Sequence, residues 1–349
     1  MNSPTIESCP IPVDAPSELV TLAHGEGGRL TRRLISQRIV PPLQNPFLAQ
    51  LGDAACLPAC RGALAISTDS YVVSPLFFPG GDIGKLAVVG TVNDLAVAGA
   101  KPRWISLAMI LEEGLPLDTL DRVMASIAEA AKLAGVVVVT GDTKVVPRGA
   151  ADGLFLTTTG IGELVPPPPP GPTSLQIGDR ILVSGPIGRH GIAVLAAREQ
   201  LGFDPAPESD CAPLTNAVDS LRRENVPVRS MRDATRGGLA AVLHEWAAAS
   251  QLTLNVGERQ IPVTPEVQGA CELLGLDPLH VACEGTMAVA VPDDAVDSAL
   301  AALRGVSEAR FAACVGIVQS PSVAAVVVRR GIRDMPLDEP LGAPLPRIC

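Results

Sequence analysis

Five consecutive prolines, Pro166 to Pro170, limit the fold of this chain more than any other feature. Proline has a fixed φ angle and no backbone N–H, so this run, with Gly171 and Pro172 after it, can continue neither a helix nor a sheet. It predicts a stiff polyproline connector. The chain has 349 residues, 47% of them hydrophobic, which exceeds the usual size of one hydrophobic core. We therefore expect the connector to join two domains.

Before the connector, strand patterns and helix patterns alternate. Alternating or β-branched apolar residues predict strands over residues 64–73, 104–111, 136–140 and 154–162. Apolar residues at helical spacing predict helices over residues 83–98 and 117–134, and Gly135 is a stop signal for the second. This order predicts an α/β (α+β) domain over residues 41–165, preceded by an N-terminal segment, residues 1–40.

After the connector the same scheme returns with different details. We expect strands over residues 180–184, 286–291 and 323–328, and helices over residues 192–201, 214–224 and 238–249. No residue-by-residue repeat relates the two halves. The second domain, also α/β, is predicted to span residues 166–334 and to be followed by a flexible tail, residues 335–349.

Charge and cysteine content exclude several classes of function. The formal net charge of −10 argues against a nucleic-acid or anionic-membrane surface. The eight cysteines do not form a dense disulfide framework, and Cys56 and Cys60 lack a second ligand pair for structural zinc. The first residues do not show the basic stretch and apolar run typical of a signal peptide, and the longest apolar runs, such as residues 136–139, are far too short to span a bilayer. We expect a cytoplasmic protein.

Four short acidic segments follow one another in the first half, around Asp53, Asp69, Asp94 and Asp142. Mg²⁺ prefers oxygen ligands and is commonly shared between one or two carboxylates and the phosphates of a substrate. The segments therefore predict a magnesium site if they converge. Each aspartate alone is more typical of a helix cap or a turn than of a metal site.

Two glycine-rich segments have the composition of anion-binding loops. His24-Gly25-Glu26-Gly27-Gly28 precedes a helix-like stretch from Leu30, an arrangement whose backbone amides can cradle a phosphate. Asp233-Ala-Thr-Arg236-Gly-Gly238 is similar, with Arg236 as a phosphate contact. A glycine-rich turn before an ordinary capped helix is the alternative for both segments.

The chain ends on Cys349, after a stretch from Gly342 with no apolar periodicity. Four prolines, at positions 336, 340, 344 and 346, predict an extended tail whose last dozen residues could span about 35 to 40 Å. A thiol on such a tether suits delivery of a covalently held group to a site elsewhere on the protein. The alternative is an exposed thiol of no consequence.

Taken together, these segments resemble the nickel-iron hydrogenase maturation factors of the HypE family. The resemblance runs from about residue 20 to the last residue and rests on the two glycine-rich segments, Gly52-Asp-Ala54, Ser67-Thr-Asp69, Gly90 to Asp94, Thr140 to Val145, Glu284-Gly-Thr286 and the ending Pro346-Arg-Ile-Cys349. The nucleotide-side segments are shared with a superfamily that includes aminoimidazole ribonucleotide synthetase, selenophosphate synthetase and thiamine-phosphate kinase. The ending separates the HypE family from those relatives.

The resemblance implies an ATP-dependent carbamoyl dehydratase. In that family the terminal cysteine accepts a carbamoyl group from the carbamoyltransferase HypF. ATP then drives dehydration of the thiocarbamate to a thiocyanate, and the cyanide passes to iron on the HypC–HypD complex. The family also implies a homodimer formed through the first domain, which binds ATP and Mg²⁺.

The resemblance carries roles over by position. Cys349, Glu284 and Lys144 become the catalytic residues, with Glu284 as the base that takes the amide proton and Lys144 as its neighbouring ammonium. The Mg²⁺ ligands become Asp53, Asp69, Asp94 and Asp142. The nucleotide contacts become His24, Gly25, Gly27, Gly28, Asn93, Asp94, Thr143, Asp233 and Arg236.

Two other classes of function fit the same segments. One is a kinase or ligase of the superfamily that acts on a free small molecule, for which ATP turnover would not need Cys349. The other is a non-catalytic assembly scaffold that presents its tail to partners, for which nucleotide would bind without hydrolysis.

Overall fold

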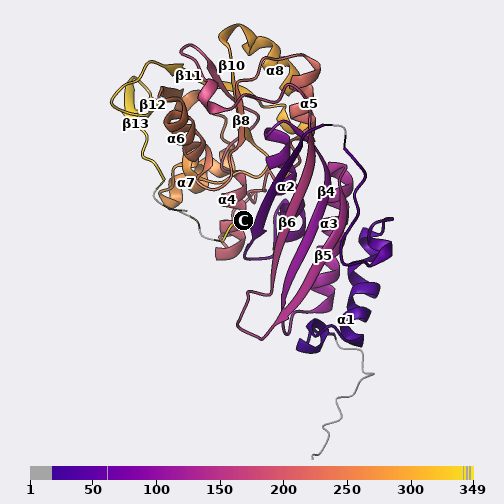
Figure 1. Ribbon diagram of the computed structural model, residues 1–349. Helices are drawn as coiled ribbons and strands as arrows, with labels where there is room; N and C mark the ends of the chain where they lie inside the picture. The colour runs from indigo at the N-terminus through magenta and orange to yellow at the C-terminus, as the bar shows by residue number, and fades with distance from the viewer. Residues whose placement is uncertain (1–17, 61, 341, 343–344, 346) are drawn as a thin grey trace, which may run out of the picture.

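The computed structural model describes residues 18–60, 62–340, 342, 345 and 347–349. The first domain is built on a four-stranded sheet in the order β1-β6-β4-β5, in which only β4 and β5 are parallel (Figure 1). Its strands are β1 (Leu64–Tyr71), β4 (Ala100–Glu112), β5 (Val137–Val146) and β6 (Leu154–Leu164). Two short strands, β2 (Phe77–Phe78) and β3 (Gly81–Asp82), pair beside it.

Two long helices cover one face of this sheet, α2 (Ile83–Val97) and α3 (Leu117–Ala134). Asp82 begins α2, because its carboxylate accepts hydrogen bonds from the backbone N–H groups of Gly84 and Lys85. Gly135 ends α3 in the left-handed conformation, at φ +69°, as the sequence predicts. The α/β fold class is confirmed, and the bounds of α3 are those expected.

The other face of the sheet is open. On β1 the exposed side chains alternate with partly buried ones, so Ile66 and Thr68 point to the open face while Ser67 and Asp69 point toward α2. Large apolar side chains remain exposed on this face, with Leu64 54% and Ile66 71% exposed on β1 and Ile110 41% exposed on β4. Among the described residues nothing covers this face, on which these apolar side chains lie beside the exposed hydroxyls of Thr68 and Thr159.

The second domain is built on a seven-stranded sheet in the order β13-β12-β9-β11-β7-β10-β8. Its strands are β7 (Arg180–Val183), β8 (Ser230–Asp233), β9 (Thr253–Gly257), β10 (Met287–Val291), β11 (Ala313–Gln319), β12 (Val326–Arg330) and β13 (Arg333–Pro336). Its helices are α4 (Arg189–Glu199), α5 (Thr215–Arg223), α6 (Gly238–Ser250), α7 (Pro265–Leu274) and α8 (Val296–Arg304). Among the described residues no helix is both long and apolar enough to cross a membrane.

Several elements differ from their prediction. Residues 141 and 142 lie inside β5 rather than after it, because Gly141 has no side chain to collide with the carbonyl oxygen of Leu107 on β4, 2.3 Å from where its Cβ would stand. β13 carries the second sheet past the predicted domain boundary at residue 334. The sequence patterns also did not predict β2, β3, β8, β9, β11, β13, α7 or α8.

The N-terminal segment forms short turns of helix along the first domain. The helix-like stretch expected from Leu30 is α1 (Arg29–Leu34), and residues 35–39 continue it as one π-helical turn. Residues 1–17 of the predicted segment lie outside the described residues.

Residues 166–171 of the proline connector contain neither helix nor strand, as predicted, and Pro172 begins a short 3₁₀ turn (Pro172–Ser174). The connector packs against Gly99, which follows α2 with φ +87°. A Cβ atom on Gly99 would stand 2.6 Å from Cδ of Pro169, so only glycine fits this approach.

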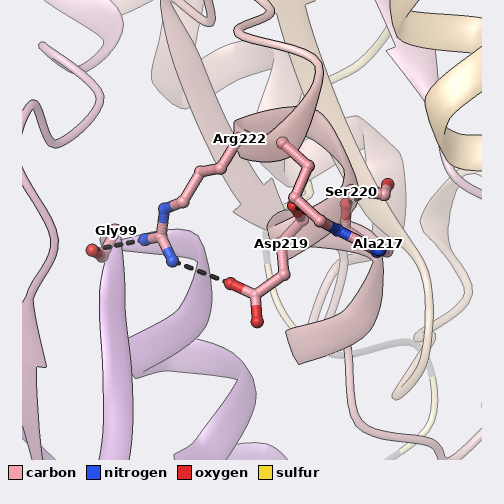
Figure 2. Close-up of polar contacts among 6 residues, drawn as sticks. Gly99, Ala217, Asp219, Ser220 and Arg222 are labelled. Atoms are coloured by element: carbon pink, nitrogen blue, oxygen red, sulfur yellow. Dashed lines mark hydrogen bonds and ion pairs between the residues drawn. The ribbon is translucent and has the colours of Figure 1, made fainter.

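Polar contacts from α2 join the two domains close to the connector. Figure 2 shows the guanidinium group of Arg222 on α5 donating to the carbonyl of Gly99 and to the carboxylate of Asp219, the latter over 3.0 Å. Deeper in the joint, Asn93 donates from its side-chain amide to the carbonyls of Ala212, at 3.2 Å, and Glu284, at 3.1 Å.

The end of the tail is docked rather than extended. Figure 1 shows the C-terminus between the two domains, and Leu345 and Ile348 are buried. The carbonyl of Arg347 accepts hydrogen bonds from Ser74 and Arg198, and its side chain forms an ion pair with Asp152. The prediction of a flexible tail therefore does not describe these last residues, because they are held by contacts to both domains.

We predict that Asn93→Ala lowers the free energy of unfolding by about 3 kcal/mol, because it leaves two buried carbonyls and the N–H of Leu214 without their partner. Chemical denaturation measures the loss. The control is Asn216→Ala, whose exposed amide reaches only Glu308 and which should cost less than about 0.5 kcal/mol. Equal losses in the two variants would contradict the role of Asn93 in the joint.

Candidate active site between the domains

A cleft of about 630 Å³ lies between β1, α2 and the second domain. It brings together four of the predicted carboxylates and the terminal thiol. We call it the acidic cleft and define it by Asp69, Asp94, Asp233, Glu284 and Cys349. Arg236 also lines the cleft. Carboxylates predicted from the first half of the chain therefore lie beside residues predicted from the second half.

The first domain supplies Asp69 from β1 and Asp94 from α2. The hydroxyl of Ser67, two residues before Asp69, donates to a carboxylate oxygen of Asp94 over 2.5 Å. Burial and the nearby charge of Asp233 raise the pKa of Asp94 to about 7. A carboxyl with this pKa is only partly ionised near neutral pH.

The second domain supplies Asp233 from the end of β8 and Glu284 from the segment before β10. Burial raises the pKa of Asp233 to about 6. Glu284 is only 3% exposed, and burial together with the charge of Asp233 raises its pKa well above the usual range. A carboxylate with a raised pKa is a stronger base, which suits it to take a proton from a weak acid.

Asp210 holds Glu284 in this place, and the sequence analysis missed it. Its carboxylate accepts from the N–H groups of Glu284 and Gly285, both at 3.1 Å, and from the hydroxyl of Thr286 at 3.0 Å. A Cβ on Gly285 would stand 1.8 Å from the carbonyl oxygen of Asp210, so the segment can approach only as glycine. Asp210 lies 74 residues before Glu284 in an irregular loop, which gives no local signal of its role.

Cys349 reaches the cleft as a neutral thiol. Burial, followed by the negative charge of Glu284, raises its pKa to about 12, and Arg236 opposes this shift. The fraction of thiolate at neutral pH is therefore much smaller in the docked tail than for a thiol at the ordinary pKa of 9.0. Only the thiolate is a good nucleophile, so the docked sulfur is poorly reactive.

A second cavity, which we call the loop cavity, lies between the N-terminal segment and β5 and encloses about 1010 Å³. Gly25, Gly27, Asp142, Thr143 and Lys144 line it. Gly25 packs directly on β5, since a Cβ there would stand 2.8 Å from the backbone nitrogen of Val145. The predicted phosphate loop therefore lies with Thr143 and Lys144, away from the acidic cleft of the same chain.

Other predicted residues have structural partners. The ring of His24 is hydrogen-bonded to Thr21, over 3.0 Å from the backbone N–H and 2.9 Å to the hydroxyl, and Gly28 precedes the first turn of α1. Asn93 lies in the domain joint, where its amide nitrogen and oxygen both have partners. Asp53 is exposed in a loop before β1.

Glu284 and Lys144 do not meet within one chain. The ammonium of Lys144 forms an ion pair with Asp142 at 2.9 Å, and both side chains are exposed on β5. Asp142 keeps a lowered pKa because of that hydrogen bond. Of the four predicted Mg²⁺ ligands, only Asp69 and Asp94 share a cleft.

These two carboxylates fit a magnesium ion that is shared with phosphates. Within the described ranges no group of three or more His, Cys, Asp or Glu residues could hold a metal by itself. Asp69 and Asp94 nevertheless interact directly, and their mutual repulsion contributes to the raised pKa of Asp94. A cation ligated by two carboxylates and completed by substrate oxygens is the usual arrangement for Mg²⁺ in phosphoryl transfer.

Comparison with known proteins identifies the family. The models of AIR synthase related protein match on both sides of the connector, the N-terminal domain over residues 51–164 and the C-terminal domain over residues 176–329. Carbamoyl dehydratase HypE of Escherichia coli (strain K12) is 47% identical over 343 residues, which covers 95% of this chain and 99% of that protein.

Solved structures agree. The crystal structure of hydrogenase maturation protein HypE in complex with ATP matches with a TM-score of 0.89 at 46% identity, over 94% of this chain and 99% of that chain. The chain in the HypE–HypF complex matches with a TM-score of 0.77 at 40% identity, over 90% of this chain and 100% of that one. The chain therefore belongs to the HypE family of hydrogenase maturation proteins.

Proposed function

We propose that this protein is an ATP-dependent carbamoyl dehydratase that converts a carbamoyl group on its own Cys349 to a thiocyanate. The observation that carries the proposal is the docking of Cys349 beside Glu284 in the acidic cleft. The names of its relatives, carbamoyl dehydratase HypE and HypE in complex with ATP, support the reaction and the nucleotide.

The reaction removes water from Cys349–S–C(=O)–NH₂ at the expense of ATP. The carbamoyl oxygen attacks the γ-phosphorus and ADP leaves, so a poor leaving group becomes a phosphate ester. Loss of both N–H protons and cleavage of the C–O bond then release phosphate and form the C≡N triple bond. A base must accept these protons, and no electron acceptor is needed.

Glu284 is the base in this scheme, because its side chain and Cys349 line the same cleft and its raised pKa strengthens it. Asp69 and Asp94 would hold Mg²⁺ with the phosphates of ATP, and the ion would offset the negative charge of the transferred phosphoryl group. Arg236 lines the same cleft and supplies a positive charge for phosphate or for the docked chain end.

The functional unit in this proposal is a homodimer joined through the open face of the first-domain sheet. The exposed Leu64, Ile66 and Ile110 favour burial against a second copy. The acidic cleft adjoins β1 at one edge of the sheet, and Lys144 lies on β5 at the opposite edge. A two-fold axis parallel to the strands sets β1 of each protomer opposite β5 of the other. Lys144 and the loop cavity of one protomer would then face the acidic cleft of its partner.

The partners follow from the same reaction. We propose that HypF loads the carbamoyl group, a role supported by the similarity to the chain in the HypE–HypF complex. The HypC–HypD complex would accept the cyanide for the iron of the hydrogenase, in the cytoplasm.

The direct test is the mass of the tail peptide after incubation with the carbamoylating partner. We expect a carbamoyl adduct on Cys349 without ATP and a cyano adduct with ATP, and neither in Cys349→Ser, because a hydroxyl is far less nucleophilic near neutral pH. An adduct on another of the eight cysteines would contradict the proposal. ATP turnover that persists in Cys349→Ser would favour a small-molecule kinase or ligase, and ATP binding without turnover would favour a scaffold.

Glu284→Gln is expected to keep ATP binding and carbamoyl loading while slowing dehydration by about 100-fold or more, because it removes the base. In the wild type the rate should rise with pH through the raised pKa of Glu284, since the reaction needs the deprotonated carboxylate. Calorimetry measures nucleotide affinity, and mass spectrometry follows conversion. Conversion at the ordinary rate in Glu284→Gln would assign the base to another group.

Mixing two inactive variants tests whether Lys144 acts across the dimer. If it does, a heterodimer of Glu284→Gln and Lys144→Ala protomers contains one intact site, and random mixing restores about a quarter of the wild-type activity. If Lys144 acts within its own chain, the mixture stays inactive. Ile66→Asp should abolish the restoration and give monomers in sedimentation, because it charges the apolar face. A wild-type monomer at micromolar concentration would contradict the dimer.

A further inference from the structure

Histidine side chains bind the backbone of the C-terminal tail at three places. The chain has four histidines, and three of them contact carbonyl groups of the tail. His244 on α6 reaches Leu337 at 3.1 Å, His280 reaches Asp338 at 3.0 Å, and His190 on α4 reaches Ile348 at 2.6 Å. A carbonyl can only accept, so in each case the imidazole Nε2–H is the donor.

His190 is the innermost of these donors and lies next to the reacting residue, since Ile348 directly precedes Cys349. Its ring is fully buried, and Phe78 packs edge-on against it with centroids 5.3 Å apart. With Nε2–H bound to the tail, Nδ1 accepts from the hydroxyl of Ser209 at 2.9 Å. The oxygen of Ser209 in turn accepts from the N–H of Cys211 at 3.1 Å. Every polar atom of the ring is therefore used, and burial keeps the imidazole neutral by lowering its pKa.

These three histidines bind the backbone of the tail and not its side chains. They are therefore indifferent to what the sulfur of Cys349 carries, whether a proton, a carbamoyl group or a cyano group. Each such hydrogen bond contributes little net free energy, and the contacts of Arg347 with Ser74, Arg198 and Asp152 add to them. Bonds of this kind suit a segment that must be docked for one step and free for another.

We propose that His190, His244 and His280 form a track of N–H donors for the tail, with His190 as the positioning residue that seats Cys349 in the acidic cleft. The proposal rests on the proposed function for its purpose, because a thiol loaded outside the cleft has to return to it. These hydrogen bonds determine the position of the Cys349 sulfur along the cleft. Release of the track exposes the thiol for loading by the partner.

The test measures docking directly, without ATP or partner. Iodoacetamide alkylates Cys349 only when the tail leaves the cleft, so the rate of adduct formation on the tail peptide, read by mass spectrometry, reports the undocked fraction. We expect His190→Leu to raise this rate by about tenfold, the equivalent of one lost hydrogen bond. His190→Gln should stay within about twofold of the wild type, because its side-chain amide can donate to Ile348 in place of Nε2–H.

A matched control separates docking from general loss of stability. Thr253→Val removes a buried hydroxyl that bonds Ala324 at 3.1 Å, in a strand remote from the tail contacts of His190. It should lower the melting temperature without changing the alkylation rate. If His190→Leu fails to fold, His280→Leu at the half-buried site serves instead, with a rise of about threefold expected.

Three results would overturn the track: an unchanged alkylation rate in the folded His190→Leu or His280→Leu protein, an equal rise in Thr253→Val, or no rescue by glutamine. Failure of the proposed function is a different result. In that case tail alkylation would respond to the histidine variants as expected, while no cyano adduct would form on the wild-type protein with ATP and the carbamoylating partner.

Discussion

The acidic cleft depends on the side-chain amide of Asn93. It ties α2 to the carbonyls of Ala212 and Glu284 and to the N–H of Leu214, so one residue joins the first domain to the segment that carries the proposed base. The next residue, Asp94, lines the cleft. The spacing between the carboxylates of the two domains is therefore fixed by a buried polar contact, and a buried polar group of this kind is costly to leave without its partners.

The charges of the cleft then determine which protonation state of the Cys349 sulfur is favoured in the docked tail. Four carboxyl groups lie in the cleft, those of Asp69, Asp94, Asp233 and Glu284. Burial and mutual repulsion raise the free energy needed to ionise a further carboxyl there, as the raised pKa of Glu284 indicates. A neutral sulfur is admitted and a thiolate is disfavoured. At neutral pH both the free thiol and the carbamoylated sulfur are uncharged, so the charges of the cleft disfavour only the thiolate. The thiol is therefore more nucleophilic outside the cleft, where loading is proposed to occur, than inside it.

Local patterns predicted the main elements of the first domain well, and those of the second domain and the site only in part. The bounds of α3 could be read from its apolar spacing and Gly135, whereas β9 and β11 lack a clear apolar alternation. The glycine-rich and acidic motifs predicted site residues, but they did not indicate that these residues line two different cavities. That separation comes from β5, which carries Lys144 on the far edge of the sheet from the acidic cleft. A motif match contains no such information, because a single sequence does not state which edge of a sheet a strand occupies.

The docked position of the tail is a second feature that could not be predicted from the sequence. The prolines of the tail predicted an extended segment. The contacts from His190, His244 and His280 go to backbone carbonyls that every residue possesses, so no side chain of the tail could have predicted these contacts. The signal lies instead in the second domain, where these histidines come from three separate elements that the fold brings onto one path. Contacts to backbone constrain the residues that make them, whereas the ion pair of Arg347 with Asp152 and the buried side chains of Leu345 and Ile348 also constrain the tail itself. The docking of the tail therefore depends on residues of both domains that lie far earlier in the chain, and no local sequence pattern indicates that they meet it.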